Sequence, residues 1–134
     1  MMQQIIYRTS PSISNKDLNA LFQASWPDHR WRDFEPVLGR SLATICAYQG
    51  ERLVGFVNLA WDGGLHAFLL DTTVHPDLRR RGIGTELVRR AADVARQRGI
   101  EWLHVDFEPH LAAFYRRCGF RYTAAGLIDL KETS

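Results

Sequence analysis

The chain has 134 residues, of which 46% are hydrophobic, and its formal net charge is +2. This length and composition predict one domain over residues 1–134 with enough apolar material for a core. The small net charge argues against nucleic-acid binding through a global positive field, and no run approaches the ~18 apolar residues of a membrane span.

Cys46 and Cys118 are too few for a disulfide framework in a chain of this length, and they are typical of reduced thiols. Residues 1–9 lack the long apolar core of a signal peptide. We therefore expect a soluble, cytoplasmic protein with no membrane partner. Monomer and homodimer both remain open.

The first elements are short. Residues 5–8 predict a strand, and Ser14 or Asn15 can cap a helix over residues 16–24. Pro27 ends that helix, and a second short helix is expected at residues 33–41.

The loop between these helices is unusually rich in aromatic and basic residues. It contains Trp26, His29 and Trp31, with Arg30 and Arg32 among them. Two interpretations remain open, because these aromatic side chains can cover a core or contact a substrate. We take Trp26, His29 and Trp31 as the substrate-binding candidates.

Three antiparallel strands follow, joined by turns at Gly50 and Gly63. Gly55, inside the second of them, indicates a bulge or a close approach of two backbones. The three strands are expected at residues 42–48, 53–61 and 66–74.

The second half alternates helices and strands. A long amphipathic helix begins after Gly84 and ends at Gly99. A strand, a short helix and a last strand come next, at residues 101–107, 111–117 and 119–122, with the last strand resuming at 127–128. This order predicts a mixed α/β (α+β) domain.

The stretch before the long helix carries the clearest chemical signal. Residues 79–84 read Arg-Arg-Arg-Gly-Ile-Gly, and Thr85 and Glu86 fall in the first helical turn. A glycine-bearing loop that enters a helix directs several unpaired N–H groups at one place, with the positive end of the helix dipole behind them. Arginines add charge-assisted contacts. The stretch therefore predicts a pyrophosphate-binding loop.

Other phosphate-binding motifs fit poorly. Gly84-Thr85-Glu86 lacks the Gly-Lys-Ser/Thr end of a Walker loop, and Leu87 occupies the third glycine position of the dinucleotide fingerprint. A plain alternative remains, namely an arginine-rich turn before an ordinary surface helix.

Two motifs together resemble those of the GNAT superfamily of N-acetyltransferases. Arg-x-x-Gly-x-Gly at residues 79–84, preceded by Val-x-Pro at 74–76, resembles the acetyl-CoA signature of that family. Phe-Tyr-x-x-x-Gly-Phe at residues 114–120 resembles its second signature. The resemblance covers residues 53–120. Many members carry an Asn a few residues before the Tyr, whereas residues 108–111 here read Glu-Pro-His-Leu.

The resemblance implies the GNAT fold, with a mostly antiparallel sheet of about six or seven strands, splayed in the middle and flanked by about four helices. It implies acetyl-CoA as cosubstrate, with pantetheine held by backbone groups of the strand before the loop. The cofactor-binding candidates are Thr72, Thr73, Val74, Arg79, Arg80, Arg81, Gly82, Ile83, Gly84 and Thr85.

Two residues are candidates for catalysis. Tyr115 is the candidate acid, because a phenol of pKa near ~10 stays protonated at neutral pH and can protonate a departing thiolate. Asp71 is the candidate base, and strand alternation places it on the face opposite Leu70 and Thr72. A hydrogen-bonded edge tyrosine and a structural aspartate remain the alternatives. His66, His29, Asp106 and Glu108 are reserve bases, and no cluster has the spacing of metal ligands.

The leading functional hypothesis is an acetyl-CoA-dependent N-acetyltransferase. It would act on a primary amine of a small molecule or peptide by direct attack in a ternary complex. The alternative is a non-catalytic acyl-CoA-binding or regulatory module. A nucleic-acid binder using residues 79–81 is disfavoured, because no stripe of further basic residues with aromatic side chains for base stacking accompanies them, and the net charge is small. The acceptor stays open: the two tryptophans favour an apolar or aromatic group, whereas Arg30 and Arg32 favour an anionic one.

Overall fold

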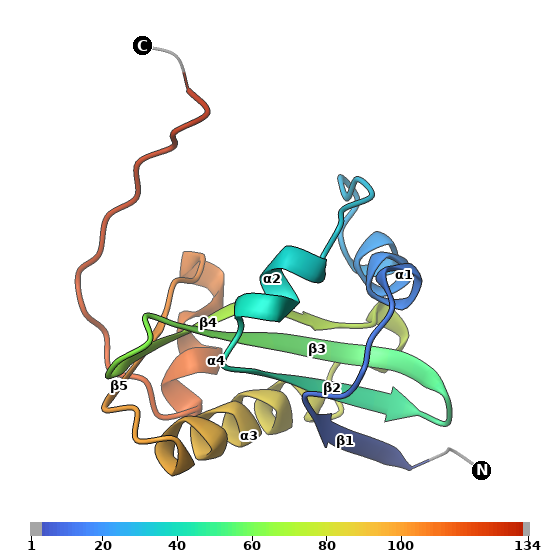
Figure 1. The fold of residues 1–134 in the computed structure, drawn as a ribbon, viewed down its shortest axis with the longest axis horizontal. Helices are drawn as coiled ribbons and strands as arrows, with labels where there is room; N and C mark the ends of the chain where they lie inside the picture. Colours follow the sequence, from blue (N-terminus) through green and yellow to red (C-terminus); the bar gives the residue numbers. More distant parts are fainter. Residues whose placement is uncertain (1–3, 133–134) are drawn as a thin grey trace.

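A computed structural model describes residues 4–132 and shows a sheet with helices on both faces (Figure 1). The sheet has five strands in the order β1-β2-β3-β4-β5. The first four are antiparallel neighbours, and β5 runs parallel to β4. The strands are β1 (Ile5–Thr9), β2 (Ala43–Gln49), β3 (Arg52–Trp61), β4 (His66–Val74) and β5 (Trp102–Val105).

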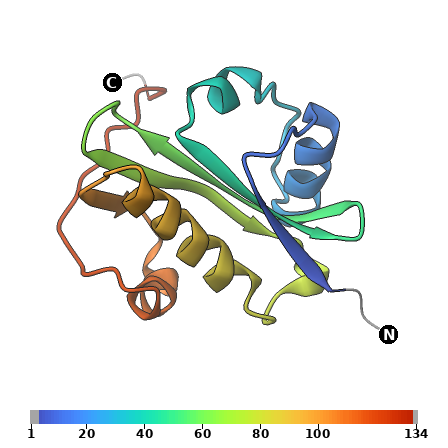
Figure 2. The same cartoon turned by 60° about the horizontal axis from the view of Figure 1, so that its bottom comes forward.

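Four α-helices flank this sheet, with α1 and α2 on one face and α3 and α4 on the other (Figures 1 and 2). They are α1 (Asn15–Ser25), α2 (Glu35–Arg40), α3 (Ile83–Gln97) and α4 (Ala112–Arg117). Two 3-10 turns, η1 (Pro76–Leu78) and η2 (Pro109–Leu111), precede α3 and α4. The mixed α+β class predicted from the sequence is confirmed.

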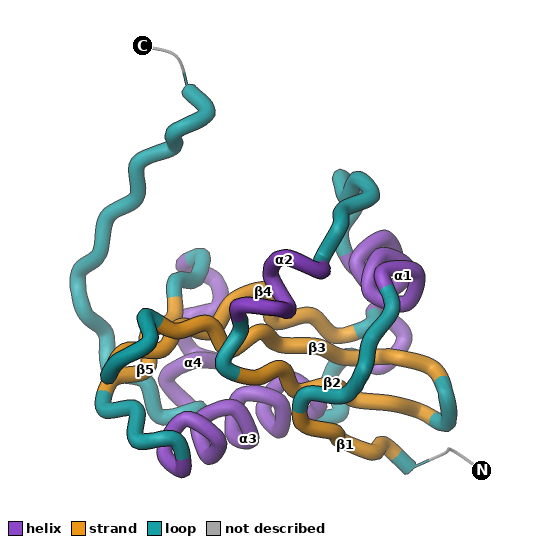
Figure 3. The backbone as a smooth tube through the Cα atoms, viewed as in Figure 1, coloured by secondary structure: helices purple, strands orange, loops and turns teal. Residues whose placement is uncertain are grey.

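The helix ends follow the local sequence. The Ser14 hydroxyl caps α1 by accepting a hydrogen bond from the Asp17 N–H at 3.0 Å. Gly99, with a φ of +80°, adopts the left-handed conformation just beyond α3. The tube in Figure 3 shows that the loop between α1 and α2 lies on the same side of the sheet as these two helices.

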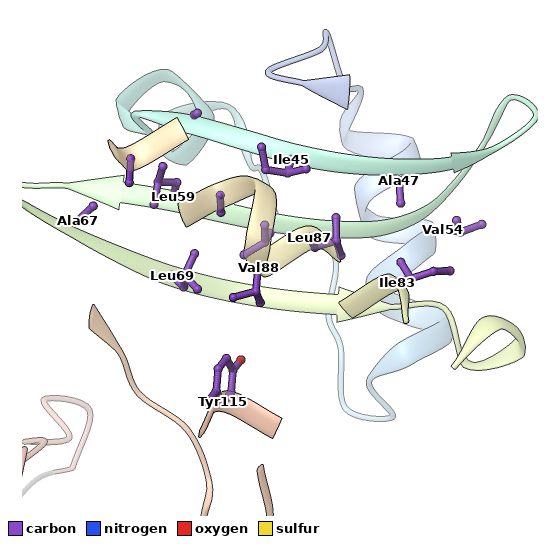
Figure 4. Close-up of a cluster of buried hydrophobic side chains, with 14 of the residues drawn as sticks. Ile45, Ala47, Val54, Leu59, Ala67, Leu69, Ile83, Leu87, Val88 and Tyr115 are labelled. Carbon is purple, nitrogen blue, oxygen red and sulfur yellow. The ribbon is translucent and has the colours of Figure 1, made fainter. Parts of the chain in front are cut away.

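The sheet separates two apolar clusters. The larger cluster lies under α3 and includes Ile45, Leu59, Leu69, Leu87 and Val88 (Figure 4). The smaller cluster lies under α1 and includes Leu18, Phe22, Phe34 and Phe56. Helices pack on both faces because β2 and β3 are apolar on both.

Of the two features expected at Gly55, the structure shows the bulge, and its close neighbours are side chains rather than a second backbone. The pairing of β2 with β3 shifts register beside it, which is a bulge. A Cβ at Gly55 would lie 3.1 Å from both the Ala47 Cβ and the Leu87 Cδ1. Glycine therefore allows α3 to approach the sheet closely.

The sheet has fewer strands than expected. Residues 119–129 contain no strand, so the predicted last strand is wrong, and the five strands are fewer than the six or seven expected. Tyr122 and Leu127 in this segment are 86% and 85% exposed. A strand needs a neighbouring strand to receive its hydrogen bonds, and within residues 4–132 no strand pairs with this segment.

Two further observations concern residues 4–132. No helix among them is long and apolar enough to cross a membrane, and no group of three His, Cys, Asp or Glu is arranged to hold a metal ion. Both cysteines are free thiols. Cys46 is buried, which raises its pKa to about 12, and Cys118 is partly exposed.

Candidate active site

The N-terminus of α3 is open to a ligand. Its first intrahelical hydrogen bond runs from the Glu86 N–H to the Gly82 carbonyl at 3.0 Å, so the N–H groups of residues 83–85 have no acceptor within the helix. Within the described chain, no side chain caps this end. Arg80 and Gly82 both adopt left-handed φ values, +66° and +79°. Such turns expose successive N–H groups, which suits an anion.

Gly82 and Gly84, the two glycines of the loop, are required for different structural reasons. A Cβ at Gly82 would meet nothing within 4 Å, so this residue is needed for its left-handed backbone. A Cβ at Gly84 would point to Phe114 Cζ at 3.4 Å and Val74 Cγ2 at 3.8 Å. Gly84 therefore sets how closely α3 approaches α4. Residues 79–81 are exposed beside this turn.

The second half of β4 has an open edge. Parallel pairing with β5 ends at Leu69 and Val105, whereas β4 continues to Val74. Within residues 4–132, no strand pairs with residues 70–74 on that side. The backbone groups of Thr72 to Val74 that face this side are thus available to a ligand. This edge leads directly through η1 to the N-terminus of α3.

A bulge places Asp71 at the middle of this region. Asp71 and Thr72 lie together opposite the single residue Val57 of β3, and Asp71 has a φ of +59°. Strict alternation predicts opposite faces for Leu70 and Asp71, and that prediction is wrong. The bulge turns Asp71 toward Arg32, in the loop on the α1 and α2 side of the sheet.

The loop between α1 and α2 meets β4 at two points. Arg32 Nη1 lies 4.0 Å from Asp71 Oδ2, and the Trp26 indole N–H donates to Thr73 Oγ1 at 3.3 Å. Burial raises the pKa of the Asp71 carboxyl, and the positive charge of Arg32 partly opposes that rise. A raised pKa makes the carboxylate a better proton acceptor.

Asn19 holds this loop in place. Its amide donates to the Arg32 carbonyl at 2.8 Å, and its Oδ1 accepts from the Arg32 N–H at 2.9 Å. The same Oδ1 lies 2.8 Å from His29 Nε2. Asn19 is 7% exposed, so these bonds lie in a largely dry setting where a polar group needs partners.

Tyr115 approaches β4 from the opposite side. It is 6% exposed and packs among Phe107, Phe114 and Phe120. Figure 4 shows it below β4, at the margin of the larger cluster. Burial raises the pKa of its hydroxyl, and a hydrogen bond with the Thr72 side chain lowers it by less. The phenol therefore stays protonated at neutral pH, as an acid requires.

The structure brings some of the predicted residues together and leaves others apart. Three contacts converge at the bulge. Asp71 forms an ion pair with Arg32, and the Thr72 side chain forms a hydrogen bond with Tyr115. Thr73 accepts a hydrogen bond from the indole of Trp26. His29 instead lies within hydrogen-bond distance of Asn19, and the Trp31 side chain is 69% exposed. Among the reserve bases, His66 Nδ1 lies 2.8 Å from His104 Nε2.

Asn19 and Arg32 were not among the predicted site residues. A polar side chain beside Leu18, on the apolar face of a helix, is a sequence signal for Asn19. The position of Arg32 depends on how the loop folds, and its sequence carries no equivalent signal.

Comparison with known proteins places this geometry in a family. The model of the acetyltransferase (GNAT) family matches residues 12–120. An uncharacterized N-acetyltransferase of Porphyra purpurea is 35% identical over 69 residues, which are 52% of this chain and 40% of that protein. The chain thus spans less than half the length of that curated relative.

Solved structures agree in fold. A GNAT family acetyltransferase from Streptococcus pneumoniae superimposes with a TM-score of 0.76 at 27% identity, covering 95% of this chain and 98% of that one. An aminoglycoside N-acetyltransferase in complex with CoA gives 0.76 at 20% identity, covering 97% and 96%. The family match spans most of the chain and includes the α3 loop, the β4 bulge and Tyr115. The chain belongs to the acetyltransferase (GNAT) family.

Proposed function

We propose that the protein is an acetyl-CoA-dependent N-acetyltransferase that acetylates a primary amine of a small molecule or peptide. The observation that carries this proposal is the continuity of two open backbone features. The unpaired edge of β4 leads through η1 into the uncapped N-terminus of α3. A long ligand with an anionic end fits such a path.

The residues present suit acetyl-CoA. N–H groups at residues 82–85 would receive the pyrophosphate, with Arg79, Arg80 and Arg81 beside them. Backbone groups of Thr72, Thr73 and Val74 would hold the pantetheine arm. The CoA bound to the structurally similar aminoglycoside acetyltransferase supports this cosubstrate.

The chemistry would be divided between the two sides of β4. Acetyl-CoA, when bound, supplies a thioester whose carbonyl carbon an amine nitrogen attacks. Tyr115 would give its hydroxyl proton to the sulfur as the C–S bond breaks. Asp71 would take the proton that the amine nitrogen loses, directly or through a water. Thr72 would orient the Tyr115 hydroxyl.

The acceptor would enter from the α1 and α2 side, beneath the loop that Asn19 holds. Arg32 already faces Asp71 there, so an anionic acceptor group would compete with Asp71 for it. Trp26 and Trp31 are exposed and offer aromatic surface. We therefore favour an amine attached to an aromatic or apolar group, in a soluble cytoplasmic setting.

A panel of primary amines, incubated with acetyl-CoA, tests the proposal. Released thiol should appear only with a competent amine, and mass spectrometry should find one acetyl group on that amine. Binding of acetyl-CoA without amine-dependent thiol release across the panel would instead indicate a non-catalytic acyl-CoA-binding module.

A further inference from the structure

The side chain of Thr73 joins the bulge of β4 to the loop that follows α1. Its hydroxyl donates a hydrogen bond to the Asp71 carbonyl at 2.9 Å and accepts one from the Trp26 indole N–H at 3.3 Å. A hydroxyl has one proton to donate and two lone pairs to accept with, so it serves both partners at once. Thr73 is 2% exposed, so water has little access to replace either bond.

The bulge turns Thr73 toward α1. Leu70 lies opposite Asn58 of β3, and Thr73 lies opposite Phe56. Residues 70 and 73 are three positions apart, so regular alternation would place them on opposite faces of the sheet. Their partners on β3 are two positions apart and share a face, so the extra residue of the bulge brings 70 and 73 to one face. That face is the one under α1, because Phe56 belongs to the smaller apolar cluster.

The backbone of Asp71 needs this support. Its φ of +59° lies in the left-handed region, which costs free energy for a residue with a Cβ. Such a conformation persists only where surrounding contacts hold it. The Thr73 hydroxyl holds the carbonyl of Asp71, while the carboxylate of Asp71 lies 4.0 Å from Arg32. The direction of the carboxylate therefore depends on a backbone that Thr73 holds.

We infer that Thr73 is a positioning residue for acetyl transfer, an inference that rests on the proposed function. Its hydroxyl fixes the backbone from which Asp71 would take the proton of the amine. Through Trp26 the same hydroxyl couples that backbone to the loop beside which the acceptor would enter. The Thr73 side chain exchanges no proton with either substrate. It acts through Asp71, because a small displacement of a reacting group lowers turnover strongly.

Two substitutions at Thr73 separate the hydroxyl from the rest of the side chain. Thr73→Val keeps the shape and removes the hydroxyl, and kcat for a competent amine should fall ~10–100-fold. The dissociation constant of acetyl-CoA should change little, because the cofactor is expected to use backbone groups here. Thr73→Ser keeps the hydroxyl and should recover most of the loss. An unchanged kcat in Thr73→Val, or an equal loss in Thr73→Ser, would overturn the inference.

Thr44→Val is a matched control. Thr44 lies on β2, is also nearly buried at 5% exposure, and is away from the bulge. The control removes the same group from the same type of strand position, so kcat should stay at the wild-type value. A loss equal to that of Thr73→Val would mean that any buried hydroxyl of the sheet has this effect, which would contradict a specific role for Thr73.

A double-mutant cycle with Asp71→Asn tests whether Thr73 acts through Asp71. In the Asp71→Asn background the base is already gone, so Thr73→Val should lower kcat by less than ~2-fold more. A residue that only supports the fold would lower kcat by the same factor in both backgrounds. Equal factors would therefore overturn the inference.

NMR spectra without substrate give a second, independent measurement. The indole N–H signal of Trp26, assigned with Trp26→Phe, should shift in Thr73→Val, and so should the Asp71 Cα signal. Both should stay near their wild-type positions in Thr73→Ser. If neither signal moves in Thr73→Val, the inference is wrong. A wild type that acetylates no amine would instead refute the proposed function, and these signals would still show whether Thr73 holds Asp71.

Discussion

The guanidinium of Arg32 lies 4.0 Å from the carboxylate of Asp71, across the space between the α1–α2 loop and the bulge of β4. Both side chains are partly exposed, so their attraction is weak, and water or a ligand can replace either partner. In the proposed reaction, an acceptor ammonium would take the place of Arg32 beside Asp71. The pair gives the proposed base a counter-charge before the substrate arrives.

Asp71→Asn tests the base. Burial raises the pKa of this carboxyl. Wild-type kcat/KM should therefore rise with pH as Asp71 loses its proton. The variant should lose this rise and most of its turnover. Asparagine tolerates the left-handed φ of +59° at this position, so the bulge should survive. The measurement is a pH–rate profile with a competent amine.

Stability separates this role from a structural one. A carboxyl whose pKa is raised by folding destabilises the fold at pH values above its unfolded pKa, so Asp71→Asn should not lower the melting temperature at pH 7. A lower melting temperature, with the pH profile retained, would make Asp71 a structural residue.

Gly82→Asp tests the anion site. The variant places a carboxylate at the N-terminus of α3 and should abolish the thermal stabilisation that acetyl-CoA gives to the wild type. Gly99→Asp is a matched control, because Gly99 lies at the other end of α3 with nearly the same φ, +80° against +79°. Both variants carry the same strain and charge. If Gly99→Asp lost binding as well, the effect would come from the fold rather than from the loop.

Gly55→Ala tests the contact between α3 and the sheet. The added methyl group meets neighbours at 3.1 Å and should lower the free energy of unfolding by ~1–3 kcal/mol. Gly39→Ala, in α2, meets nothing within 4 Å and should raise it by ~0.5–1 kcal/mol. Chemical denaturation of the two variants measures the size and sign of each change in the free energy of unfolding. Equal small effects would mean that α3 packs less closely than described.

Glu86→Gln tests the charged network on α3. Hydrogen bonds from Arg89 and Arg90 lower the pKa of Glu86 to about 2. The stability from this carboxylate is therefore present above its unfolded pKa near 4.5 and is lost as pH falls toward about 2. The wild type should lose up to ~1 kcal/mol more than the variant over this window, since exposure weakens such pairs. Parallel curves of unfolding free energy against pH would contradict the assignment.

The order of helices and strands could be predicted as far as α4, because Gly50, Gly63 and Gly99 mark turns and the apolar periods between them are regular. The last strand, expected at residues 119–122, could not. Apolar residues there fit a strand, but a strand forms only where it pairs, and within residues 4–132 no strand pairs with this segment.

The candidate site divides in the same way. The loop before α3 could be predicted because glycine at position 82 has a local, conformational cause. The direction of Asp71 could not, because the bulge arises from how β4 pairs with β3. The position of Arg32 depends on hydrogen bonds to its backbone from Asn19, which lies thirteen residues earlier in the sequence.

Tyr115→Phe tests the central claim most directly. The variant removes one hydroxyl and keeps a ring that packs among three phenylalanines, so the dissociation constant of acetyl-CoA should change little. Turnover of a competent amine, followed by thiol release, should fall ~10²–10⁴-fold, because the departing sulfur loses its acid. An unchanged turnover would contradict the account and leave Tyr115 with a packing role only.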